Sequence, residues 1–211
     1  MFFRVFVFVL GVCMLSFGIA TVTQAHLGTG SVSSLAYVLT LATGISIGTF
    51  VFATNLFFYI VEIAVDRKDI VKRALIQLPT TLLFSVCIDL AMPVAGLIAP
   101  ETYVGKFVMV LCGTMVIGFG ISSMVHARLA ILPVEGAVLA IMHRFGGSFG
   151  TLRVMADVFL VTSAVIVSFA VFGELQGVRE GTIVAACLGG TFAKIFLKGW
   201  SKISHGHTAV D

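Results

Sequence analysis

The carboxylate of Asp89 stands deep inside an apolar stretch, within the sequence FSVCIDL at residues 84–90. An ionised carboxylate in the core of a bilayer costs about 2.5–3.5 kcal/mol even on insertion scales. Asp89 should therefore face a cavity, pair with a cation or carry a proton. We expect it to bind a substrate's cation or a coupling proton. The alternative is an acid that only fastens helices together.

Two further polar residues, Asn55 and Asp157, lie 102 residues apart in apolar segments. Because the sequence repeats at that spacing, as shown below, we expect both side chains to approach a common axis and line the same site. Asp157 also lies four residues after Arg153. An ion pair within one helix is therefore the alternative interpretation for Asp157.

Glu135 follows Pro133 at the expected start of a short helix, where a carboxylate either serves a site or simply caps the helix dipole. The residue 102 positions earlier is Ser33, which precedes Ser34, and we include both serines among the candidate binding residues. Three other acids, Glu62, Asp66 and Asp69, lie close to the basic loop at 67–73 and are interpreted as its solvated neighbours.

Two G-x-S-x-G matches centre on Ser46 and Ser148. A serine hydrolase would need a strand–turn–helix setting and a base aimed at the serine, and neither is visible in the sequence. A histidine base remains the alternative, from His26, His126 or His143. The glycines instead open apolar helices, where small residues permit close packing, so we expect a structural role and no enzyme.

No pattern in the chain indicates a cofactor. The four cysteines show neither C-x-x-C nor Cys/His ligand spacing and are interpreted as core residues, so we expect no metal site. Walker, Rossmann and H-E-x-x-H patterns are also missing. The basic residues do not form one patch, so the net charge of +3 does not indicate nucleic-acid binding.

The sequence segments that position these residues occur twice in the chain. A gap-free shift of 102 residues places HLGTGSVSSLAYVLTLATGISIGTFVFATN, residues 26–55, on a second copy. The shift aligns these pairs: Ala25/Ala127, Leu27/Leu129, Gly44/Gly146, Gly48/Gly150, Gly11/Gly113 and Gly18/Gly120. Such self-similarity indicates an internal duplication.

Composition indicates a membrane protein, since 59% of residues are hydrophobic and 11% are charged, far from soluble domains. Six apolar spans are predicted, at 2–25, 47–65, 74–98, 104–127, 150–172 and 181–199. Residues 2–25 also resemble a signal peptide, but the same segment recurs mid-chain at 104–127, which favours a span.

Three spans per copy is an odd number, so the copies must cross the membrane in opposite senses. We therefore predict an all-α fold of two inverted three-helix repeats, residues 1–102 and 103–199, followed by a cytoplasmic tail at 200–211. The positive-inside rule then places both termini in the cytoplasm, because only Lys106 and Arg179 among thirteen Lys and Arg residues fall outside.

Between the first and second span of each copy lies a segment too interrupted for a crossing. We predict two short half-helices, re-entrant or lying at the interface as amphipathic connectors. Their glycines and proline are expected to gate the site or permit close packing, and the predicted set is Gly28, Gly30, Gly44, Gly48, Pro133, Gly136, Gly146 and Gly150.

Several of these motifs together suggest a family. LGTGSVSSLAYVLT, GISIGTFVFATNLFF and QLP followed by CIDL in the first copy, with LPVEG, FGTLRV and GVREGT in the second, resemble the bacterial YczE/YyaS/YitT membrane proteins over residues 1–199. The resemblance implies the predicted fold and a bacterial inner-membrane location. It departs at Gly30-Ser31 and Ser33-Ser34, where many relatives have proline or a Trp-Asp pair, so no role of that acid is carried over.

The favoured function is secondary transport of an unidentified small solute, by analogy with inverted-repeat transporters. The alternative is a membrane scaffold or accessory protein that binds another membrane protein without transport. The expected partners are the lipid bilayer and the solute, with a homo-oligomer left open.

Overall fold

The computed structural model describes residues 2–67 and 70–206, and these residues form helices joined by short loops. The helices are α1 (Phe2–Gln24), α2 (Ser31–Thr43), α3 (Ile47–Val65), α4 (Ile70–Leu97), α5 (Tyr103–Ala127), α6 (Pro133–Phe145), α7 (Phe149–Phe172) and α8 (Glu180–Gly206). Six of them, all but α2 and α6, are long and apolar enough to cross a membrane. The predicted all-α fold, with six helices that are long and apolar enough to cross a membrane, is therefore confirmed.

The two short helices occupy the predicted places between the first and second span of each copy. Helix α2 follows an extended Gly30 and ends at Gly44, whose φ of 74° is the left-handed cap that glycine favours. Helix α6 starts at Pro133, whose fixed φ suits a first helical position, and ends at Gly146. Each has 13 residues, and their first residues, 31 and 133, are 102 positions apart.

The G-x-S-x-G serines start the next helices. Ser46 Oγ accepts a hydrogen bond from the Thr49 N–H (3.3 Å), and Ser148 Oγ accepts one from the Thr151 N–H (3.2 Å). A serine in extended backbone that accepts such a bond is an N-cap, since it satisfies one of the free N–H groups of the first turn. Both serines therefore fix where α3 and α7 begin.

Helices α1 and α5 form the centre of the bundle and cross in opposite directions. A Cβ at Gly11 would lie 3.0 Å from the Gly120 carbonyl oxygen, and a Cβ at Gly18 would lie 2.8 Å from that of Gly113. As residue numbers rise along α1 they fall along α5, so the two helices are antiparallel. The four glycines let the backbones touch, as small residues do between membrane helices.

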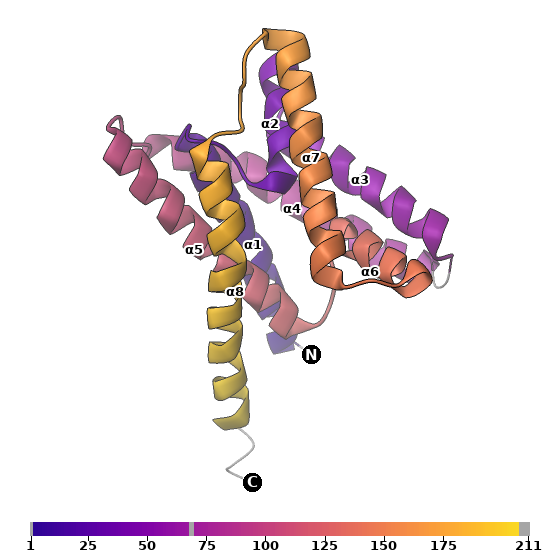
Figure 1. The fold of residues 1–211 in the computed structure, drawn as a ribbon. Helices are drawn as coiled ribbons and strands as arrows, with labels where there is room; N and C mark the ends of the chain where they lie inside the picture. The colour runs from indigo at the N-terminus through magenta and orange to yellow at the C-terminus, as the bar shows by residue number, and fades with distance from the viewer. Residues whose placement is uncertain (1, 68–69, 207–211) are drawn as a thin grey trace.

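The remaining helices pack around this pair in matching ways. Helix α1 packs against α4 as α5 packs against α8, and α2 packs against α7 as α6 packs against α3. Each short helix thus contacts the second span of the other copy as well as the second span of its own copy. In Figure 1, α8 runs beside α5, and the start of α1 and the end of the described part of α8 lie toward the same side.

One pair of equivalent contacts differs between the two halves. Helix α3 packs against α4, whereas α7 and α8 make no comparable contact within the described residues. Figure 1 shows α7 standing away from α8, joined to it by an extended connection. A Cβ at Gly48 would overlap the Ser85 carbonyl oxygen and the Asp89 carboxylate, while no described atom lies within 4 Å of one at Gly150.

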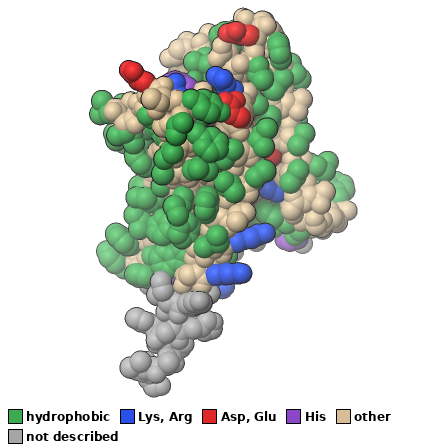
Figure 2. Space-filling model, turned by 60° about the vertical axis from the view of Figure 1, so that its left-hand side comes forward, with side chains coloured by type: hydrophobic (Ala, Val, Ile, Leu, Met, Phe, Trp, Pro, Cys, Tyr) green, Lys and Arg blue, Asp and Glu red, His purple; other side chains and the backbone are tan. Residues whose placement is uncertain are grey.

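The surface is apolar over most of its middle. Hydrophobic side chains cover that part of the face in Figure 2, with charged side chains mainly toward its upper and lower ends. Such a distribution suits a protein surrounded by lipid. Helix α8 continues to Gly206, so the first residues of the predicted tail are helical, and residues 207–211 lie outside the described part.

Candidate functional site

The starts of both short helices meet one turn of α7. Arg153 and Asp157 lie on that turn, with Nη2 and Oδ1 3.4 Å apart. The Ser31 hydroxyl, on the first residue of α2, donates to Asp157 Oδ1 (2.7 Å). From α6, Glu135 Oε1 lies 3.6 Å from Arg153 Nη1. We call Ser31, Glu135, Arg153 and Asp157 the α7 cluster.

The α7 cluster combines two carboxylates with one guanidinium and two helix N-termini. Its formal charge is negative, and the positive ends of the α2 and α6 dipoles offset part of that charge. Glu135 Oε2 is buried and has no hydrogen-bond partner among the described residues. The ion pair between Asp157 and Arg153, which was the alternative interpretation of Asp157, is present. Asp157 also accepts a hydrogen bond from Ser31 on α2, so its contacts extend beyond its own helix.

Asn55 lies on α3 and is 1% exposed. Its Nδ2 donates to the Val51 carbonyl oxygen (2.9 Å), and its Oδ1 is buried with no partner in the described residues. The two predicted serines are buried but bond locally, Ser33 to the Gly30 carbonyl oxygen (3.1 Å) and Ser34 to that of Ser31 (2.8 Å). Ser31, which is not among the predicted binding residues, is the serine whose hydroxyl donates to Asp157.

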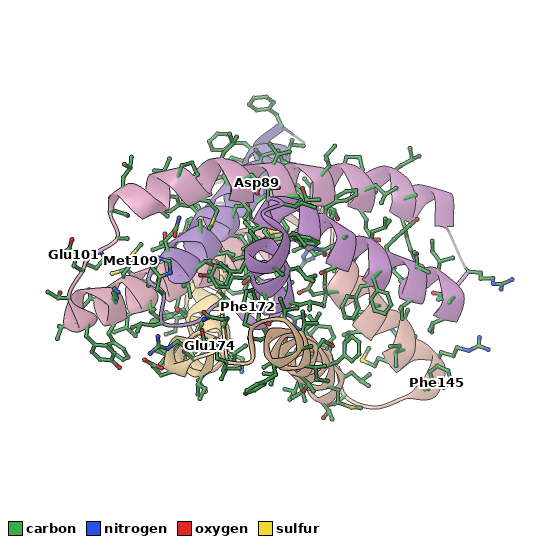
Figure 3. All side chains as sticks on the ribbon, turned by 90° about the horizontal axis from the view of Figure 1, so that it is seen from above. Asp89, Glu101, Met109, Phe145, Phe172 and Glu174 are labelled. Carbon is green, nitrogen blue, oxygen red and sulfur yellow. The ribbon has the colours of Figure 1, made fainter. Side chains whose placement is uncertain are left out.

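Both carboxylate oxygens of Asp89 are held by the start of α3. The Gly48 N–H donates to Oδ1 (2.7 Å), and the Ser46 hydroxyl donates to Oδ2 (2.8 Å). The carboxylate thus satisfies a free N–H of the first turn and favours the positive end of the helix dipole. Figure 3 labels Asp89 on α4 beside the start of α3. This geometry is that of an interhelical fastening, the alternative interpretation of Asp89.

The predicted gating positions divide by their surroundings. Gly28 has a φ of 117° and lies against Thr182 and Arg179, next to two backbone bonds that join residues 27–29 to the start of α8 and the loop before it. Gly136 contacts the Glu62 carboxylate, so that a Cβ there would overlap it. The C-cap glycines Gly44 and Gly146 have no described atom within 4 Å of an added Cβ. Gly28, in the connection before α2, and Gly136, in the first turn of α6, therefore lie in close contact with other elements, whereas the two C-cap glycines do not.

Glu62 was expected to be solvated, and this expectation is wrong because the residue is 3% exposed. Its carboxylate accepts from Arg73 Nη1 (3.2 Å) and Gln77 Nε2 (3.1 Å), both on α4. Arg73 Nη2 also donates to Asp66 (2.7 Å), and Asp69 lies outside the described residues. Helix α3 packs against α6, and Gly136 of α6 lies against the Glu62 carboxylate. This packing covers an acid that a position near the loop alone would leave in water.

A cavity of about 260 Å³ opens beside Glu62, between α3, α4 and α6. Its polar lining comes from Glu62, Asp66, Arg73, Gln77 and His143, and its apolar lining includes Ile76, Leu129, Ile131, Leu139 and Ala140. We call it the Glu62 cavity. Gln77 is 6% exposed, and its Oε1 has no partner among the described residues.

A sequence signal for this region exists. Polar residues recur every fourth position along α4, and this stripe comprises Arg73, Gln77, Thr81, Ser85 and Asp89. Residues four apart are neighbours on a helix surface, so the spacing indicates a polar stripe that winds slowly around a membrane helix. Read as a set rather than as Asp89 alone, the stripe would have indicated Gln77 and Arg73.

Comparisons with known proteins agree with the sequence resemblance. Residues 2–198 match a family described as "Family of unknown function (DUF6198)". The chain is also similar to the Bacillus subtilis (strain 168) protein named "Uncharacterized protein YyaS", at 24% identity over 189 residues, covering 89% of each chain. No solved structure matches.

Proposed function

The chain belongs to the DUF6198 family, consistent with the YyaS-type resemblance, and on that premise we propose that it is a secondary transporter of a small solute. In this proposal residues 1–102 and 103–199 are inverted repeats, and access to the site alternates between the two sides of the membrane. Both termini lie in the cytoplasm of a bacterial cell.

The reciprocal glycine contacts support the inversion. Exchanging the copies by 102 residues carries Gly11 and Gly120 onto Gly113 and Gly18, the other pair in contact. A two-fold axis between α1 and α5 would produce this exchange. Since the two helices are antiparallel and both long enough to span a membrane, that axis would lie in the membrane plane.

The observation that carries the transport proposal is the difference between the two equivalent helix pairs. Helix α3 is docked on α4 through Asp89 and Gly48, whereas α7 is parted from α8. Two copies of one sequence unit in two conformations are what alternating access requires, because one half closes as the other opens. In the opposite state α7 would dock on α8 and α3 would leave α4.

Spin labels test this exchange in proteoliposomes. One protein would carry labels on cysteines at Met155 of α7 and Leu188 of α8, with the native cysteines replaced. A second would carry them at the equivalent positions Ala53 of α3 and Val86 of α4, both of which are exposed. We expect two distance populations in each protein and opposite shifts when the membrane gradient is reversed. If each pair of labels showed one fixed distance under all conditions, the alternative function as a membrane scaffold would be favoured. The protein bound by that scaffold would then cover α7, which is largely exposed.

A further inference from the structure

Two segments that are far apart in the sequence are joined by hydrogen bonds at one end of the molecule. Residues 27–29, which lead into α2, lie against residues 177–182, which include the start of α8, and Figure 1 shows the connection from α1 to α2 passing that start. The Thr29 N–H donates to the Gly177 carbonyl oxygen (3.0 Å) and to Thr182 Oγ1 (3.1 Å). We call these two segments the outer latch, because the predicted topology places this end of the molecule outside the cell.

The outer latch is tightly closed. Thr29 is 1% exposed and Thr182 is 5% exposed. The Gly181 N–H donates to the Leu27 carbonyl oxygen (2.7 Å), and a Cβ at Gly28 would overlap Thr182 Oγ1, so a glycine is needed for this approach. Loop backbone groups usually bond to water, whereas these satisfy one another. The contact therefore excludes water from this end of the molecule.

The equivalent place in the other half is open. A shift of 102 residues carries the two segments of the outer latch onto residues 129–131 and 75–80. No backbone hydrogen bond joins these two segments among the described residues. Instead, residues 129–131 and Ile76 line the Glu62 cavity of about 260 Å³. Thr29 is 1% exposed, while its counterpart Ile131 is 47% exposed. The same position in the repeat is thus closed in one half and hollow in the other.

The outer latch also joins parts that the proposed cycle would move relative to each other. Helix α2 packs against α7 and is bonded to it through Ser31 and Asp157, whereas α8 packs against α5. If α7 docked on α8, α2 would move with α7 relative to α8. The bonds between residues 27–29 and residues 177–182 would then have to break.

We propose that the outer latch is the external gate of the carrier, closed in this structure, and that the Glu62 cavity is the equivalent cytoplasmic gate in its open form. In the opposite state the outer latch opens and residues 129–131 close on residues 75–80. The cytoplasmic closure has one bond fewer, because Pro79 stands where Gly181 donates its N–H in the outer latch. The inference rests on the proposed function, since the two gates alternate only in a carrier.

Hydrogen exchange of the protein in lipid nanodiscs tests the first part, because a bonded amide exchanges only when its bond opens. Thr182→Val keeps the shape of the side chain and removes the oxygen that accepts from Thr29. We expect peptides that cover the outer latch to exchange roughly fivefold faster. Thr80→Val is the matched control at the equivalent position, where the hydroxyl donates to the Ile76 carbonyl oxygen within α4 (2.7 Å), and should not speed their exchange. Should Thr182→Val fail to fold, Thr29→Val is the second variant, since it keeps the backbone bonds and loses only the hydroxyl bond to Gly177.

A bulky maleimide on Ile131→Cys, in a protein whose native cysteines are replaced, tests the coupling of the two gates. The label would hold the Glu62 cavity open, so the state with an open outer latch would become less populated. We expect the peptides of the outer latch to exchange at least fivefold more slowly than in the unlabelled variant. Phe145→Cys with the same label is the control, because this residue is 73% exposed and lies at the edge of the molecule in Figure 3.

Unchanged exchange after labelling at position 131 would overturn the inference, because the outer latch would then be a structural fastening that opens independently of the cavity. Unchanged exchange in both threonine variants would overturn it as well. In either case the spin labels on α3, α4, α7 and α8 could still confirm the proposed exchange of helix contacts. Coupled gates in a protein that moves no solute would instead contradict the transport proposal and leave the coupling standing.

Discussion

Gly11 of α1 faces the backbone of Gly120 on α5, and the same contact recurs with the copies exchanged between Gly113 and Gly18. A Cβ at Gly120 would lie 2.5 Å from the Leu15 nitrogen, a backbone atom that cannot rotate away. The crossing of the two central helices therefore depends on residues without side chains.

Replacing Gly120 by alanine should destabilise the protein by about 1–3 kcal/mol, the usual cost of overpacking a close contact. Unfolding in mixed micelles measures the change. Gly190→Ala is the control, because no described atom lies within 4 Å of an added Cβ there. An equal response at both positions would show that α1 and α5 do not meet at Gly120.

Removing the charge of Asp89 should loosen α3 from α4. Asp89→Asn should cost about 1 kcal/mol, since a charge-assisted bond to the Gly48 N–H and a favourable helix-dipole interaction are weakened. A double-mutant cycle with Ser46→Ala should show coupling, because the two side chains are bonded at 2.8 Å. The same cycle with Ser148→Ala should be additive. Full stability of Asp89→Asn together with lost solute response would instead favour the binding role that the sequence predicts.

Much of the fold follows from the sequence because hydropathy and periodicity are strong in membrane spans. The six apolar helices and the two short helices could be predicted, since glycine and proline stop helices for local steric reasons. Gly44 and Gly146, predicted to gate the site or to permit close packing, instead cap the ends of α2 and α6. Glu62 was misjudged because its burial depends on a contact between α3 and α6, which no local pattern encodes. Ser31 was missed because its bond to Asp157 joins residues 126 positions apart.

The two loops near Arg67 and Arg144 should both face the cytoplasm. Eleven of thirteen Lys and Arg residues fall on that side in the predicted topology, and such an excess keeps a loop inside. Single cysteines at these two positions, in a protein lacking native cysteines, should be protected in intact cells from an impermeant thiol reagent and labelled after lysis. A cysteine at Lys106 should label before lysis. Labelling of positions 67 and 144 from opposite sides would disprove the inversion.

The G-x-S-x-G serines should act as helix caps and not as nucleophiles. Ser148→Ala should cost about 1 kcal/mol of stability, since the Thr151 N–H loses its acceptor. Ser46→Ala should cost more, because the bond to Asp89 is lost as well. A nucleophilic serine would form a covalent adduct with a fluorophosphonate, because its hydroxyl is the atom that makes the bond. We expect no adduct at either serine by intact-protein mass spectrometry. A stoichiometric adduct that is abolished by Ser46→Ala or Ser148→Ala would contradict the transporter proposal and would indicate a serine hydrolase instead.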